Sequence, residues 1–123
     1  MKRSKYPGAE IVAFDPAHCM LYREEVYSLF LHLHNSDFLH NSPYVRNILI
    51  QPGPLTRPPN ERSIVTPSFR IIDFGRTERY DAYLARARGA TKEDRERTAE
   101  HHFANDCRME NGRVKEALGM PLP

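Results

Sequence analysis

The chain has 123 residues, which is enough for one modest hydrophobic core and argues against a second independent domain. Hydrophobic residues make up 40% and charged residues 28%, which is typical of a globular protein and excludes a wholly disordered chain. The formal net charge is only +2 and no arm or patch of one sign stands out, so we expect neither nucleic acid nor an acidic membrane as the main partner.

The N-terminal residues 1–16 predict a flexible arm, because apart from the short apolar run 11–14 they offer little to bury. Their basic residues 2–5 allow a nuclear-localisation signal as the alternative to a solvated tail. The arm lacks the apolar stretch of a signal peptide, and no run of the chain approaches membrane-spanning length. We therefore expect a soluble intracellular protein, cytoplasmic or nuclear, with reduced thiols at Cys19 and Cys107.

An amphipathic helix is predicted over about residues 17–36, where apolar side chains recur at helical spacing. Asp15 followed by Pro16 is a suitable start, since a capping residue then precedes a proline in the first turn. The polar run 35–37 is a suitable end. The apolar face of this helix consists of Tyr22, Val26, Leu29, Phe30 and Leu33.

Two short apolar runs, 48–50 and 69–72, predict the strands of one small antiparallel hairpin. Residues 52–67 between them contain five prolines, so we expect an irregular surface excursion and not sheet interior, with a proline-rich partner motif as the alternative. Asn47 opens the first strand and Asp73 closes the second. The hairpin would thus bring an amide and a carboxylate to one rim, where they could bind a hard cation such as magnesium.

The residues around this hairpin resemble motifs of the eukaryotic protein kinase family. Asp73-Phe74-Gly75 matches the D-F-G of that family, and His40 followed seven residues later by Asn47 matches the frame H-R-D-x-x-x-x-N of its catalytic loop. The resemblance implies part of a kinase C-terminal lobe. It also implies that Asn47 and Asp73 are the magnesium ligands, that Phe74 and Gly75 complete the ATP-binding turn, and that His40 is a structural residue packed beside that turn.

The chain also departs from the kinase pattern. Ser42 stands at the position of the catalytic Asp, Asn41 at that of the preceding Arg, and Tyr44 where many kinases have a lysine that contacts phosphate. A serine hydroxyl cannot accept the substrate proton as a carboxylate does, and general-base catalysis is typically worth about a hundredfold to ten-thousandfold. No glycine-rich loop precedes the motif and no A-P-E follows it, so the resemblance implies a fragment or a degenerate relative.

Two helices are predicted after the hairpin. Residues 76–89 have apolar positions at near-helical spacing, with Gly89 as the stop. Thr91 then resembles the first residue of a capping box, with Asp94 as its acidic partner, and it begins a charged helix that Gly112 is expected to bend or divide. This second helix should extend from about 92 to 118, with a thin apolar stripe formed by Ala99, Phe103, Cys107, Val114 and Leu118.

Six histidines raise the question of a metal site. His32 and His34 are two residues apart, so a helix would not place both on one face, and the adjacent His101 and His102 diverge likewise. Neither pair has the neighbouring ligands that zinc sites show, so ordinary surface or core histidines are the preferred interpretation.

These observations predict an α+β chain, mostly α, in which residues 17–80 form a partial kinase-like C-terminal lobe and 81–123 a charged helical tail. The leading functional hypothesis is a pseudokinase-type binding or regulatory module with residual elements for ATP and magnesium. One alternative is a protein serine/threonine kinase whose N-terminal lobe comes from a longer product or a partner. The other is a non-catalytic helical interaction protein. Each hypothesis allows a protein partner or protein substrate, and none predicts an oligomeric state.

Overall fold

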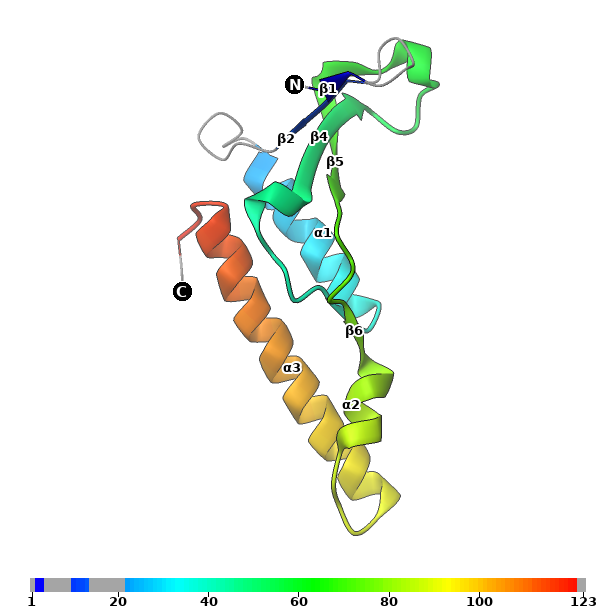
Figure 1. Cartoon of the computed structure of the whole chain (residues 1–123), viewed down its shortest axis with the longest axis vertical. Coiled ribbons are helices and arrows are strands. Elements are labelled where there is room, and N and C mark those ends of the chain that lie inside the picture. Colours follow the sequence, from blue (N-terminus) through cyan, green and yellow to red (C-terminus); the bar gives the residue numbers. More distant parts are fainter. Residues whose placement is uncertain (1, 4–9, 14–21, 122–123) are drawn as a thin grey trace.

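The described part of the chain comprises residues 2–3, 10–13 and 22–121, and its main elements are three α-helices and two antiparallel sheets, with short 3-10 helices at Val45–Asn47 and Pro59–Glu61. The computed structural model in Figure 1 is elongated, with the larger sheet near one end, α2 near the other, and α3 running between them. The chain is thus an α+β protein, as the sequence predicts. The helices are α1 (Arg23–Asn35), α2 (Tyr80–Arg86) and α3 (Lys92–Ala117). The larger sheet has the strand order β1-β2-β4-β5, formed by β1 (Lys2–Arg3), β2 (Glu10–Ala13), β4 (Ile48–Gly53) and β5 (Ser63–Ile71). In the smaller sheet, β3 (Phe38–Leu39) pairs with β6 (Glu78–Arg79).

The predicted hairpin is present as β4 and β5. The two strands are antiparallel, with Ile48 opposite Ile71 and Ile50 opposite Phe69. Because side chains alternate along a strand, this register directs Ile48, Ile50 and Phe69 to the same face, and all three are buried in the main core.

The prediction that residues 52–67 lie outside the sheet is wrong at both ends. β4 includes Pro52 and β5 includes Pro67. Proline fits at these positions for two reasons: the β4–β5 ladder is irregular between Gln51 and Gly53, and β5 is an edge strand, where a missing backbone N–H costs little. Only the segment between the two strands remains an irregular excursion, and it is mostly exposed.

The N-terminal arm expected over residues 1–16 is partly sheet. β1 pairs with β2, and β2 pairs with β4 through Val12 opposite Ile50 and Ala13 opposite Leu49. The larger sheet therefore has four strands in place of the single hairpin that was expected. The pairing depends on a contact between segments that are far apart in the sequence. Without β2, β4 would expose a row of unpaired backbone groups on one side. The local sequence of the arm gives no sign of this pairing. The predicted helix start at Asp15 and Pro16 lies outside the described residues.

The main core joins α1, the hairpin and the end of α3. Val26 and Phe30 of the predicted apolar face are fully buried, and they pack with the hairpin residues, with Val114 of α3 and with Leu118, which follows α3. Each such side chain contributes about 1.5–3 kcal/mol of burial free energy. α1 ends at Asn35, where the sequence predicts it, and the backbone N–H of Ser36 closes the last turn.

The C-terminal helices confirm some predictions and correct others. The Thr91 side chain caps α3 by accepting a hydrogen bond of 3.1 Å from the backbone N–H of Asp94, as the capping signature predicts. α3 is one continuous helix through Gly112, so this glycine does not divide it. Burial of Glu110 and Val114 on either side offsets the helix penalty of about 1 kcal/mol for a glycine.

The helical tail expected over residues 81–123 is not separate from the region before it. Val114 of α3 and the C-cap residue Leu118 belong to the main core, and Tyr83, Ala99 and Phe103 form a second core cluster with Leu39 of β3. The predicted boundary at residue 80 therefore falls inside one continuous packing arrangement. None of the described helices is both long and apolar enough to cross a membrane.

Candidate functional site

The hairpin brings the two predicted magnesium ligands to the same rim. The register places Asn47 just before the first β4 pair and Asp73 just after the last residues of β5. The backbone N–H of Ile72 donates a hydrogen bond of 2.8 Å to the carbonyl oxygen of Asn47, so the two strand ends are directly connected. The predicted hairpin therefore brings the backbones of the two residues to one rim.

His40 links this rim to the core. The ring is fully buried, its Nε2 lies 2.9 Å from the carbonyl oxygen of Ile72, and its Nδ1 accepts a hydrogen bond of 3.1 Å from the backbone N–H of Ser42. These roles require the tautomer with hydrogen on Nε2. The ring centroid is 5.2 Å from that of Phe74 and 5.9 Å from that of Phe30 on α1. His40 therefore packs beside the Asp73-Phe74-Gly75 turn, the position that the kinase resemblance implies for it.

Ser42 and Asn47 are joined within the loop. The side-chain Nδ2 of Asn47 donates a hydrogen bond of 2.8 Å to the carbonyl oxygen of Ser42, and both residues are buried. This bond fixes the orientation of the amide of Asn47. The hydroxyl of Ser42 lies in the same short loop, where the kinase frame has a carboxylate, so the loop lacks the proton acceptor of that frame.

Asp73 and the two residues after it form an exposed turn. The backbone of Asp73 is left-handed, with φ 62°, a conformation that Asp and Asn adopt more readily than most residues. Within the described part of the chain the carboxylate of Asp73 makes no hydrogen bond or ion pair, and Phe74 is half exposed. The carboxylate is therefore available to a ligand.

Two side chains with oxygen donors lie at this rim. They are the exposed carboxylate of Asp73 and the amide oxygen of Asn47, and no group of three or more His, Cys, Asp or Glu that could hold a metal occurs in residues 2–3, 10–13 and 22–121. Mg²⁺ is commonly held by one or two protein oxygens, with water and phosphate oxygens completing its octahedron. A magnesium ion held by such a pair would need water or phosphate oxygens for its remaining ligands.

Glu110 on α3 is the functional residue that the sequence analysis missed. Its side chain is buried, with only 1% of the residue exposed, and it accepts three hydrogen bonds. The donors are Nε2 of His34 at 2.6 Å, the backbone N–H of His40 at 3.0 Å and the backbone N–H of Asn41 at 2.6 Å. Glu110 thus anchors the loop that carries His40 and Ser42. A signal was present, because Glu110 falls on the apolar stripe of α3, three residues after Cys107 and four before Val114.

The electrostatics of Glu110 keep it ionised at neutral pH. Burial raises the pKa of this carboxyl, but the hydrogen bonds from His34, His40 and Asn41 outweigh that effect, and the net pKa lies below its ordinary value. The other ring nitrogen of His34, Nδ1, is buried without a hydrogen-bond partner. His34 is therefore a buried structural residue directed at a carboxylate, whereas His32, His101 and His102 are exposed.

Asn41 fastens the loop to the segment after the turn. It has a left-handed backbone with φ 67°, and its Nδ2 donates to the carbonyl oxygen of Arg76 at 2.9 Å and to Glu78 at 3.0 Å. Glu78 also accepts a hydrogen bond of 2.8 Å from Arg86, and this bond is the main reason that the pKa of Glu78 is lowered. The arginine position of the kinase frame is thus occupied here by a shorter side chain with its own partners.

Cys107 lies beside this network as a free, half-buried thiol. Burial, with the charges of Glu110 and Asp106, raises its pKa to about 11, so the thiol is protonated and weakly nucleophilic at neutral pH. Cys19 lies outside the described residues.

No protein-family model, curated protein or solved structure matches the chain significantly. The case for the kinase family therefore depends on the residues and the geometry described above.

Proposed function

We propose that the chain is a partial protein-kinase-like domain that works as a pseudokinase-type binding or regulatory module. The observation that carries the proposal is the connected unit formed by the loop and the turn. His40 contacts Phe74 and Ile72, and Asn47 is hydrogen-bonded to Ser42 through its side chain and to Ile72 through its backbone. Two motifs that are 32 residues apart in the sequence, counted from His40 to Ile72, thereby share one rim.

The ligand of this rim in our proposal is ATP with magnesium. The carboxylate of Asp73 and the amide oxygen of Asn47 would hold the ion, and a bound magnesium ion supplies neutralisation of phosphate charge. Asp73 contributes an unpaired charge at the surface. Asn47 contributes an oxygen whose direction is set by the bond from its Nδ2 to Ser42.

Little phosphotransfer is expected from this rim. Ser42 offers no carboxylate to the attacking hydroxyl. The nearby carboxylates have other roles, because Glu110 is buried with three hydrogen bonds and Glu78 is held by Arg86 and Asn41. A group that already accepts such bonds is a poor base, since protonation would break them.

Thermal unfolding tests the binding part of the proposal. A ligand that binds only the folded chain raises the melting temperature, by an amount that corresponds to about 2.7 kcal/mol at a hundredfold excess over Kd. We expect a rise of several degrees with ATP and magnesium and none with ATP and EDTA. Asp73→Asn should abolish the rise, since asparagine tolerates the left-handed backbone and lacks the charge.

The matched control is Asp81→Asn, which removes an exposed carboxylate on α2 and should leave the rise intact. No rise for the wild type in any condition would contradict the proposal and would favour the helical interaction protein. Transfer of phosphate to a protein substrate by the wild type would favour the serine/threonine kinase. Under our proposal the wild type transfers no measurable phosphate, and Ser42→Asp restores the missing carboxylate for comparison.

A further inference from the structure

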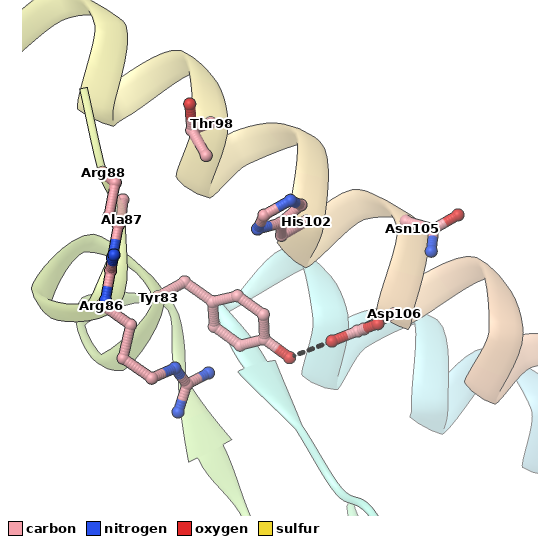
Figure 2. Close-up of a pocket in the computed structure, with 8 residues that line it drawn as sticks. All are labelled: Tyr83, Arg86, Ala87, Arg88, Thr98, His102, Asn105 and Asp106. Carbon is pink, nitrogen blue, oxygen red and sulfur yellow. Dashed lines mark hydrogen bonds between the residues drawn. The ribbon is translucent and has the colours of Figure 1, made fainter. Parts of the chain in front are cut away.

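A hollow lies between α2 and α3, away from the hairpin rim. It has a volume of about 420 Å³ and is bounded by the end of α2 and by one face of α3 (Figure 2). Tyr83 reaches across from α2 to Asp106, with Arg86 beside it and His102 one helical turn before Asp106. The ring of Tyr83 and the methyl group of Ala87 give the hollow an apolar wall.

Several polar groups around the hollow are already committed to partners. The hydroxyl of Tyr83 donates to Asp106 at 2.6 Å, and burial together with this carboxylate raises the pKa of Tyr83, so the phenol adds no negative charge. Arg86 donates to Glu78 at 2.8 Å and lies over the ring of Tyr83, with its guanidinium carbon 4.7 Å from the centroid. These contacts make one side of the hollow rigid.

Arg88 and His102 are the polar groups of the hollow that have no hydrogen bond or ion pair in the described part of the chain. Both also line a second, more open hollow of about 630 Å³, which adds Arg97 and His101. Arg88 and His102 therefore stand where the two hollows meet. The carboxylates nearby are occupied, Asp106 by Tyr83 and Asp94 by Arg97 at 3.3 Å, so they repel an incoming anion less than free carboxylates would.

We propose that this hollow binds an organic phosphate monoester, with the phosphate on Arg88 and His102 and the organic group against Tyr83 and Ala87. A guanidinium without a partner is the protein group best suited to phosphate, because its planar donors form paired charged hydrogen bonds. Imidazole adds a further donor. The hollow is larger than a single phosphate ion, and the organic group of the monoester would fill the space that is left beside the apolar wall. The proposal makes no use of Asp73 or Asn47 and does not depend on the proposed function.

Calorimetric titration of phenyl phosphate into the full chain tests the inference. We expect saturable binding at one site, weaker binding of inorganic phosphate by at least about fivefold, and no binding of phenol. Arg88→Gln should weaken the binding of phenyl phosphate by about tenfold, because the variant loses a charged hydrogen bond. His102→Gln should weaken it less. Both residues are exposed, so the variants should fold.

Arg113→Gln provides the matched control, because Arg113 is an exposed arginine of α3 that lines neither hollow. The affinity of this variant for phenyl phosphate should stay within about twofold of that of the wild type. Phosphotyrosine and phosphoserine peptides then distinguish a modified protein from a small metabolite as the source of the monoester. Absence of saturable binding, equal affinity for inorganic phosphate, or an equal loss in Arg113→Gln would overturn the proposal.

Discussion

The two ends of the β4–β5 hairpin share the same strands but are held in different ways. At the inner end, where Asn47 and Asp73 lie, the neighbouring loop has buried hydrogen bonds to Glu110 of α3, 70 residues away from His40 in sequence. At the outer end, residues 54–66, the side-chain hydrogen bonds among the described residues span at most 13 residues, and Val65 is 78% exposed. The difference shows that contacts with distant elements, and not the strand sequences, determine which end is anchored to the rest of the fold.

This difference matters for function because the kinase-like residues are at the rigid end. A site that holds a cation through two oxygens needs both of them in fixed positions before the ligand arrives. The anchoring by Glu110 and His40 provides that rigidity at the inner end. The outer end has no comparable support in the described residues, and we assign no site to it.

Removing the buried carboxylate of Glu110, which anchors the inner end, should cause the largest loss of stability. Glu110→Ala leaves His34 and two backbone N–H groups without an acceptor in a buried position, and we expect the free energy of unfolding to fall by about 3–5 kcal/mol. Urea denaturation at pH 7 measures this loss. Glu116→Ala, at an exposed position of the same helix, should change it by less than about 0.5 kcal/mol. Similar losses in the two variants would show that Glu110 is no anchor.

Acid should weaken the same anchor. The pKa of Glu110 in the folded chain lies below its usual value of 4.5, so as the pH falls the unfolded chain takes up the proton first. The stabilisation is therefore complete above about pH 4.5 and is lost as the pH falls through the folded pKa. We expect the difference in unfolding free energy between the wild type and Glu110→Gln to be constant from about pH 7 to 5.5 and to shrink below. A difference that grows in acid would contradict this sign.

Loss of the side-chain hydrogen bonds of Asn41 should lower the free energy of unfolding by a smaller amount. Asn41→Gly keeps the left-handed backbone without strain and removes only the side-chain bonds to Arg76 and Glu78, so we expect a loss of about 1 kcal/mol. Asn41→Ala should cost about 1–2 kcal/mol more, because alanine resists positive φ. The order of the two variants in urea denaturation is the test. Equal stability of both would show that the backbone conformation at this position contributes nothing.

Matched changes at the two ends of the hairpin should give the smallest effects. Val65→Thr, at the outer end, should change the unfolding free energy by less than about 0.5 kcal/mol because Val65 is exposed. Ile48→Val, at the inner end, removes one buried methylene and should cost about 0.5–1.5 kcal/mol. A larger loss for Val65→Thr than for Ile48→Val would mean that the outer end is packed against a surface absent from our account.

Local patterns in the sequence predict the local structure well. The apolar spacing of α1 identifies Val26 and Phe30 as core, the two apolar runs identify β4 and β5, and the Thr91 cap marks the start of α3. Each of these signals depends on residues that are close in sequence, where periodicity and capping chemistry act directly.

Long-range contacts are where the sequence analysis fails. β2 joins the sheet because β4 has a free side, and α3 continues through Gly112, where Glu110 and Val114 of the same helix are buried. Glu110 falls on the apolar stripe of a helix that is otherwise rich in charged residues. A carboxylate on an otherwise apolar stripe indicates a buried acceptor, and its donors come from a loop that no local pattern could identify.

The most direct test of the central claim uses Mn²⁺ in place of Mg²⁺ with ATP, in an NMR spectrum of backbone amides. The account predicts paramagnetic broadening that is strongest for Asn47 and residues 73–75, absent at residues 64–65 of the outer end, and lost in Asp73→Asn. Uniform weak broadening, or broadening centred on the acidic residues of α3 with the inner end unaffected, would contradict a cation site at the hairpin rim.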